Sequence, residues 1–203
     1  MVITNIINGF TAFGTIAVAV SAIWGAWFRF KLAPTKLALV EHTPEGDLTT
    51  FTPPGTRVLF YQMKVINQRR WLPAENCRVM LVGVSRRDPS GVFQPLPMSV
   101  PSQFTWAPSE VMPPTVTVLR EQVVDFGYVA ENSNRFIPRV YWMSNNFQGY
   151  VGPNEAMRFQ VRIEAVNFSS PIYVVEVSWD GQWSDNPATM RHHLPPIRPR
   201  LSP

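Results

Sequence analysis

The sequence contains a single cysteine and few charged residues. One cysteine excludes a fold stabilised by disulfides within the chain, and it excludes a zinc site built from several cysteines. Charged residues make up 16% of the 203 residues, against about 25% in an average soluble domain. The 18 basic residues exceed the 14 acidic ones only slightly, which does not indicate a nucleic-acid-binding protein. A hydrophobic share of 45% also excludes a disordered chain.

The motifs of common catalytic and cofactor sites are missing as well. The sequence has no G-x-S-x-G nucleophile elbow, no G-x-x-x-x-G-K-[ST] phosphate loop and no G-x-G-x-x-G dinucleotide loop. Its three histidines are His42, His192 and His193. None of them stands at metal-ligand spacing from a cysteine, an aspartate or a more distant histidine. The sequence therefore predicts no cofactor and no metal site.

The strongest catalytic candidates have simpler structural interpretations. Asp180 and Asp185 could act as paired carboxylates, but Asp180 and Gly181 together are typical of a turn. Cys77 falls on the inward face of a predicted strand, where a free cysteine behaves as a small hydrophobic residue. We therefore expect that the protein is not an enzyme.

The N-terminal segment lacks charge altogether. No Lys, Arg, Asp or Glu occurs between Met1 and Phe28. A helix that rises about 1.5 Å per residue needs roughly 20 apolar residues to cross a bilayer, and the run Ile6–Phe28 is long enough. No basic residue precedes the run, which disfavours a cleavable signal peptide. We predict a transmembrane anchor over residues 1–31.

Residues suited to a membrane interface follow the apolar run. They are Trp24, Trp27, Arg29, Lys31 and Lys36. Basic residues beside a span tend to stay in the cytoplasm, and aromatic residues gather at the membrane surface. We therefore expect a single-pass protein of the bacterial inner (plasma) membrane with a cytoplasmic C-terminal domain. An extracytoplasmic envelope module with inverted topology is the alternative.

Small residues recur along the predicted span. Gly14, Ala17, Ser21 and Gly25 are spaced three or four apart, and such spacing lets two helix backbones approach closely. The pattern favours a homo-oligomer formed through the helix, although small residues are also common in membrane helices generally. It leaves open a second function, a self-associating membrane effector whose C-terminal domain acts as a sensor.

Alternating hydrophobicity dominates the rest of the chain. After a linker at 32–55 that includes a possible first strand, the clearest strands are 57–67, 76–84, 156–167 and 171–181. Weaker strands are expected at 104–107, 115–119, 122–128 and 139–143. Period-two alternation indicates antiparallel sheets with one buried face. The sequence predicts a mainly β fold, with a β-sandwich over 56–184.

One strand-turn-strand corner has a recognisable construction. Asn67 can bond its own backbone to start the turn, Ala74 fits beneath the corner, and Asn76 can close it. The stretch FYQMKVINQRRWLPAENCRVMLVGV that contains them resembles the second and third strands of bacterial immunoglobulin-like domains of the CARDB kind. The whole chain also resembles small bacterial membrane proteins with one N-terminal helix. The resemblance implies an immunoglobulin-like sandwich used for contacts, without catalysis.

Basic and proline-rich segments are further candidates for contacts with lipid or with a partner. The arginine pairs 69–70 and 86–87 lie in two predicted turns; if these turns lie at opposite ends of the sandwich, only one pair can touch anionic lipid. The Pro/Arg-rich residues 185–203 predict an extended or flexible tail, and the proline-rich segment 88–114 is the expected contact loop.

The leading hypothesis is a membrane-anchored, non-catalytic interaction or assembly module. Its partners would be the lipid bilayer and another protein, and not nucleic acid.

Overall fold

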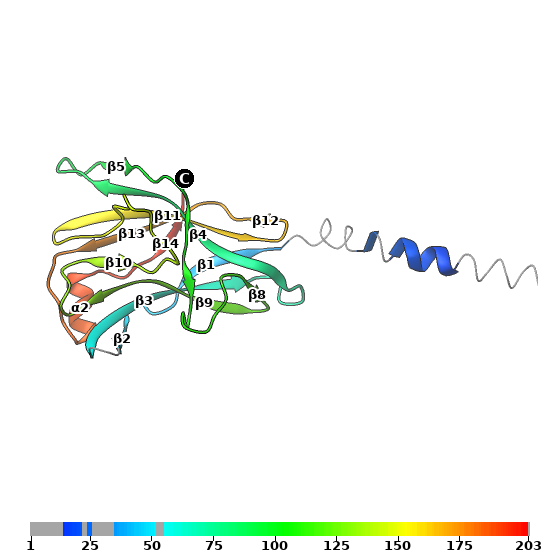
Figure 1. Ribbon diagram of the computed structural model, residues 1–203, viewed down its shortest axis with the longest axis horizontal. Coiled ribbons are helices and arrows are strands. Elements are labelled where there is room, and N and C mark those ends of the chain that lie inside the picture. Colours follow the sequence, from blue (N-terminus) through cyan, green and yellow to red (C-terminus); the bar gives the residue numbers. More distant parts are fainter. Residues whose placement is uncertain (1–13, 22–23, 26–34, 52–54, 203) are drawn as a thin grey trace, which may run out of the picture. The chain divides into compact units, whose positions relative to one another are not determined.

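The computed structural model describes residues 14–21, 24–25, 35–51 and 55–202 (Figure 1). It divides into two compact units, Met1–Thr35 and Lys36–Pro203. In the first unit, residues 14–21 and 24–25 are helical. No helix within the described ranges is long and apolar enough to cross a membrane. Much of the span predicted over 6–28 lies outside those ranges, so the span stays a prediction.

The second unit, here called the β-rich domain, is built from antiparallel strands in two sheets. The first sheet contains β1 (Leu37–Glu41), β2 (Asp47–Phe51), β3 (Thr56–Asn67), β7 (Thr105–Trp106), β9 (Glu121–Ala130) and β10 (Phe136–Pro138). The second contains β4 (Ala74–Arg87), β5 (Phe93–Leu96), β6 (Ser102–Gln103), β8 (Val116–Val118), β11 (Glu155–Ala165), β12 (Phe168–Ser169), β13 (Tyr173–Trp179) and β14 (Pro199–Leu201). The main orders are β1-β3-β9-β10 and β14-β13-β11-β4-β5. The predicted mainly β fold is confirmed, and two sheets are consistent with a β-sandwich.

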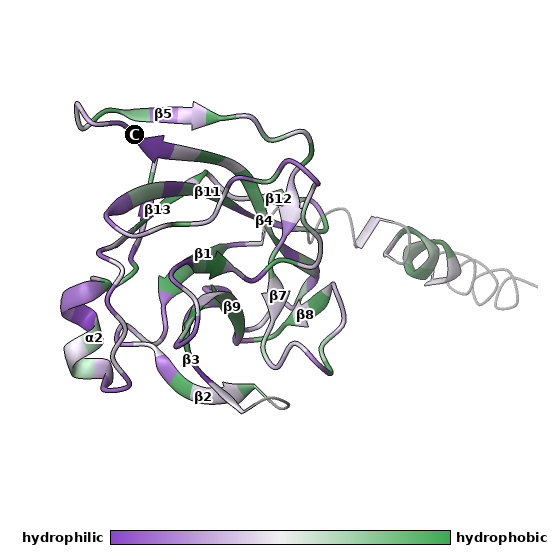
Figure 2. Cartoon of the chain, turned by 60° about the vertical axis from the view of Figure 1, so that its left-hand side comes forward, coloured by the Kyte–Doolittle hydropathy of each residue, from purple (hydrophilic) through white to green (hydrophobic). Residues whose placement is uncertain are grey.

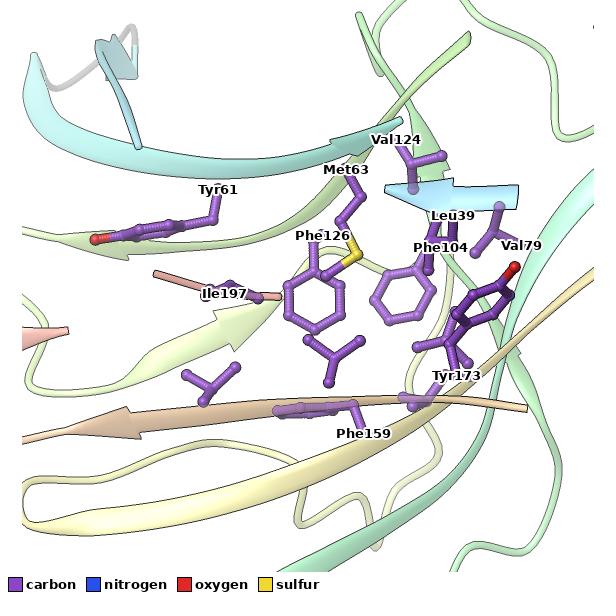
Figure 3. Packing of buried hydrophobic residues seen from close by; sticks show 14 of the residues in the cluster. Leu39, Tyr61, Met63, Val79, Phe104, Val124, Phe126, Phe159, Tyr173 and Ile197 are labelled. Carbon is purple, nitrogen blue, oxygen red and sulfur yellow. The ribbon is translucent and has the colours of Figure 1, made fainter. Parts of the chain in front are cut away.

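The core lies between the two sheets (Figure 3). The first sheet contributes Tyr61, Met63 and Phe126, and the second contributes Phe159, which is completely buried. The rings of Phe126 and Phe159 meet edge to face, with centroids 5.5 Å apart. Burial of a large apolar side chain stabilises a fold by about 1.5–3 kcal/mol, so this layer dominates the free energy of folding.

The C-terminal segment is part of this core, contrary to the extended tail that its prolines predict. Residues 187–193 form α2 (Pro187–His193), and residues 199–201 form β14, which pairs with β13. Met190, Leu194 and Ile197 are buried in the hydrophobic core. Pro187 opens the helix, where a missing backbone N–H does no harm. The prolines thus mark the ends of elements in this segment, and they do not prevent its packing.

Two other segments differ from the sequence prediction. Residues 139–143 form no strand, and only Val140 makes an isolated bridge, to Phe104; the strand in this region is β10, a few residues earlier. The expected contact loop at 88–114 contains β5, β6 and β7. Since these short strands pair with β4 and β9, much of this segment belongs to the sheets.

Candidate functional site

Asn67 organises the corner between β3 and β4. Its side chain is wholly buried, and its Oδ1 accepts a hydrogen bond from the backbone N–H of Arg69 at 2.9 Å. Its Nδ2 donates to the carbonyl oxygens of Leu72 at 2.7 Å and Val118 at 3.1 Å. One side chain therefore fixes the 68–72 turn against the end of β8.

Ala74 and Asn76 lie at the start of β4, just after this turn. Ala74 is 1% exposed, and the pairing of β4 with β8 shifts register between Ala74 and Cys77. Asn76 sits inside this irregularity with a φ of 51°, a left-handed conformation that asparagine adopts more easily than most residues. These two positions shape the corner and carry no chemistry of their own.

The carboxylates of Asp180 and Asp185 have different side-chain partners, His193 and Arg57. Asp180 Oδ1 accepts from the backbone N–H of Gln182 at 2.8 Å, across a turn in which Gly181 has a φ of 93°. Asp180 Oδ2 lies 2.8 Å from His193 Nδ1. Asp185 instead pairs with Arg57, with 2.6 Å between Oδ2 and Nη1. Burial raises the pKa of the Asp180 carboxyl, but the hydrogen bonds from His193 and the Gln182 N–H outweigh it, so this pKa lies below its usual range.

A groove of about 490 Å³ crosses the outer face of the second sheet over β11, β13 and β14. Along β13, the residues Tyr173, Val175 and Val177 point into the core. The alternate residues Val174, Glu176 and Ser178 therefore line the groove. Three arginines complete it, namely Arg158, Arg198 and Arg200. We call it the arginine groove; Figure 2 shows the hydrophilic residues of β11 that alternate with its apolar ones.

Only two of the three arginines are held by carboxylates. Arg158 Nε lies 3.0 Å from Glu176 Oε2, and its guanidinium stacks over the ring of Phe93 at 3.8 Å from the centroid. Arg198 Nε lies 3.0 Å from an oxygen of Glu41. Arg200 forms no ion pair with any residue in the described part of the chain. Glu176 and Glu41 thus offset two of the three guanidinium groups. The Arg200 guanidinium is left to bind an anion, since arginine binds carboxylate and phosphate groups through two parallel hydrogen bonds.

A smaller pocket of about 280 Å³ adjoins the groove and shares Ser178 and Pro195 with it. Arg87, His192 and His193 line this pocket beside α2, together with the acidic residues Glu155 and Asp180. Within the described ranges, no serine, threonine or cysteine side chain is hydrogen-bonded to His193. The same residues contain no cluster of three or more histidine, cysteine or acidic side chains that could hold a metal ion.

The residues predicted for the membrane interface and for helix association are only partly described. Trp24 is 53% exposed, and Lys36 is exposed at the start of the β-rich domain. Trp27, Arg29 and Lys31 lie outside the described residues. Gly14, Ala17, Ser21 and Gly25 all lie in helical residues, and the first three are exposed. Their roles stay predictions.

The arginine groove is the site that sequence reasoning missed. Arg198 immediately precedes β14 and Arg200 lies within it, and a spacing of two residues in extended chain places both side chains on one face. The proline content of 185–203 instead predicted a flexible tail. No family model matches the chain, and no curated protein matches it either. The chemistry of the groove is therefore the only guide to what it binds.

Proposed function

We propose that the protein is a membrane-anchored, non-catalytic interaction module whose β-rich domain holds an acidic segment of another protein. The convergence of Arg158, Arg198 and Arg200 in one groove, with Arg200 unpaired among the described residues, carries this proposal. An aspartate- or glutamate-rich segment supplies the carboxylates that these guanidinium groups would bind.

The groove suits an extended segment. It runs beside β14, which is the last strand in the order of its sheet, and a terminal strand can accept a further strand through its backbone. Each exposed ion pair contributes only about 0.2–1 kcal/mol. Binding therefore requires several arginines at once, and it weakens as salt screens the charges.

The membrane part of the proposal rests on the sequence. An uncharged run over 6–28 followed by Arg29, Lys31 and Lys36 supports a single span with the domain in the cytoplasm of a bacterium. Two antiparallel sheets and the corner built on Asn67 support an immunoglobulin-like sandwich of the CARDB kind. In this proposal the anchor holds the domain at the inner membrane and the groove recruits the partner.

A photo-cross-linking amino acid at Val174, on the floor of the groove, tests the proposal in isolated membranes. The full-length chain should cross-link to a partner, and the yield should fall by about tenfold or more in the triple variant R158Q/R198Q/R200Q. The same yield should fall as the salt concentration rises.

Arg78→Gln supplies the matched control. Arg78 lies in β4 on the same sheet but is paired with Glu164 at 2.8 Å and does not line the groove. The control should cross-link like the wild type. Equal cross-linking by the triple variant and the wild type would contradict recruitment through the arginine groove.

A further inference from the structure

One end of the β-rich domain gathers basic and apolar side chains from three separate segments. They are Lys36 at the start of β1, Arg69, Arg70 and Trp71 in the turn between β3 and β4, and Leu119 and Arg120 between β8 and β9. We call this set the basic tip. In Figure 1 it lies at the end of the domain where β8 is labelled, and α2 marks the opposite end.

Backbone hydrogen bonds hold the three segments together. The N–H of Gln68 donates to the carbonyl oxygen of Lys36 at 2.9 Å, and the N–H of Asn67 donates to that of Arg120 at 2.8 Å. The buried Asn67 side chain adds its bond to the carbonyl of Leu72. The tip is therefore a fixed surface of the fold, prepared before any ligand arrives.

The cations of the tip stand out because carboxylates do not neutralise them within the described ranges of the domain. Lys36, Arg69, Arg70 and Arg120 form no ion pair with any residue that the structure describes. By contrast, Arg57 and Arg78 each lie 2.8 Å from a carboxylate oxygen. Two acidic residues lie near the tip. Glu75 is exposed at the start of β4, and Glu121 is already paired with Lys64 at 3.1 Å, so the tip keeps an excess of positive charge.

Two large apolar side chains stand among these cations. Trp71 is 68% exposed and Leu119 is 60% exposed, so neither contributes much to the core. Tryptophan prefers the polar–apolar boundary of a bilayer, and leucine prefers the hydrocarbon beneath it. Trp71 follows Arg70 and Leu119 precedes Arg120 in the sequence, and exposed tryptophan and leucine beside basic residues fit a lipid surface better than they fit bulk water.

We propose that the basic tip docks on the surface of an anionic lipid bilayer, with Trp71 and Leu119 inserted at the level of the headgroups. The proposal rests on the proposed function, because the anchor would keep the domain near lipid. The chain enters the domain at Lys36, which is itself a member of the tip. The proposed docking surface therefore includes the residue at which the β-rich domain begins.

The structure also indicates which of the two arginine pairs, 69–70 or 86–87, can face the lipid. Arg86 and Arg87 end β4, whereas Arg69 and Arg70 precede its first residue, so the pairs lie at opposite ends of a 14-residue strand. Arg86 is engaged within the fold, 3.8 Å from Glu155 Oε1 and 3.3 Å from the carbonyl oxygen of Gln148. The pair at 69–70 faces the lipid in this proposal, and the pair at 86–87 does not.

A spin label at Leu119→Cys tests this docking in the full-length chain. The chain is reconstituted into phosphatidylcholine vesicles with or without phosphatidylglycerol, and the depth of the label is measured from its collisions with oxygen and with a water-soluble nickel chelate. Val92→Cys is the matched control, since Val92 is 54% exposed in the turn after β4 at the other end of the domain. The native Cys77 is completely buried and should not take the label.

The Leu119 label should contact lipid in phosphatidylglycerol vesicles, and the Val92 label should stay in water. Each basic residue near an anionic surface strengthens binding about fivefold. In R69Q/R70Q/R120Q, the lipid-contacting fraction of the Leu119 label should therefore fall sharply. A Leu119 label that stays in water although Arg69, Arg70 and Arg120 are all present would overturn the proposal.

An alkaline carbonate wash of the same vesicles separates this inference from the proposed function. If the chain resists the wash but its Leu119 label is in water, the result supports the anchor and contradicts docking of the tip. If the wash removes a chain whose Leu119 label contacted lipid beforehand, the result supports docking of the tip and contradicts the anchor.

Discussion

Arg198 and Glu41 face each other across the boundary between the two sheets, with 3.0 Å between Nε and Oε2. Glu41 ends β1, the first strand of the β-rich domain, and Arg198 immediately precedes β14, the last. Because Arg198 is 63% exposed, the ion pair itself contributes about 1 kcal/mol or less. The buried Leu194 and its neighbours in the core supply most of what holds the C-terminal segment in place.

Leu194→Ala should therefore destabilise the domain strongly. Leu194 is completely buried, and truncation of a buried leucine costs about 2–5 kcal/mol through lost burial and the cavity left behind. Urea unfolding of the detergent-solubilised full chain, followed by tryptophan fluorescence, measures the change. Arg198→Gln is the control and should cost about 1 kcal/mol or less. Equal midpoints for Leu194→Ala and the wild type would mean that the segment does not pack as described.

Asn67→Ala should loosen the corner that carries Arg69 and Trp71. The substitution leaves the buried carbonyl group of Val118 and the partly buried one of Leu72 without the donor that they have now, and loss of a partner by a buried group costs about 1–3 kcal/mol. Hydrogen exchange should rise at the amides of the 68–72 turn, and the free energy of unfolding should fall. Gln68→Ala alters an exposed neighbour and should change neither quantity.

Cys77 should resist thiol reagents in the folded protein. The residue is completely buried, and burial raises the pKa of its thiol to about 11, so little thiolate forms near neutral pH and none of it is accessible. An aromatic disulfide reagent at pH 8 should react with Cys77 only after urea is added. Stoichiometric labelling without urea would show that the core around β4 opens readily.

Asp125 should make stability depend on pH. Asp125 is 5% exposed, and burial raises the pKa of its carboxyl group above the usual range despite the hydrogen bond from Gln62 and the positive charge of Arg139. When the pKa of an acid is higher in the folded state than in the unfolded state, the free energy of unfolding falls as the pH rises and the acid ionises. The free energy of unfolding of the wild type should therefore fall relative to that of Asp125→Asn as the pH rises. The fall should begin near pH 4, the pKa of aspartate in an unfolded chain, and end above the pKa of Asp125 in the folded state.

Asp88 provides a comparison in the same pH range, because its effect on the pH dependence of stability has the opposite sign to that of Asp125. Hydrogen bonds from the Ser90 hydroxyl and from Gln94 lower the pKa of Asp88 to about 2. Its contribution to stability is present above the unfolded pKa of about 4 and is lost as the pH falls toward 2. A difference in stability between Asp125→Asn and wild type that stays constant with pH would contradict the raised pKa of Asp125.

The sheets were predictable because their signal is local. Along β11 the buried Phe159, Val161 and Ile163 alternate with charged or polar residues, and this period follows directly from strand geometry. The C-terminal segment was not predictable in this way. Its prolines suggested disorder, whereas Met190 and Leu194 pack only because distant strands supply their neighbours.

The arginine groove depends on tertiary pairing even more. The pairing of β13 with β14 places Arg200 opposite Val174, and the pairing of β11 with β13 places Arg158 opposite Glu176. Each of these pairings joins residues that lie far apart in the sequence, so no short sequence pattern predicts them. Membrane anchoring, by contrast, rests on the sequence alone, since much of the run that predicts it lies outside the described residues.

Cross-linking from Val174 in isolated membranes tests the central proposal most directly, because it asks whether the groove of the full-length chain holds a partner. We expect a cross-linked product with the wild type and with Arg78→Gln, reduced about tenfold or more in R158Q/R198Q/R200Q and progressively by salt. A product of equal yield in all three proteins, insensitive to salt, would contradict recruitment by the groove arginines.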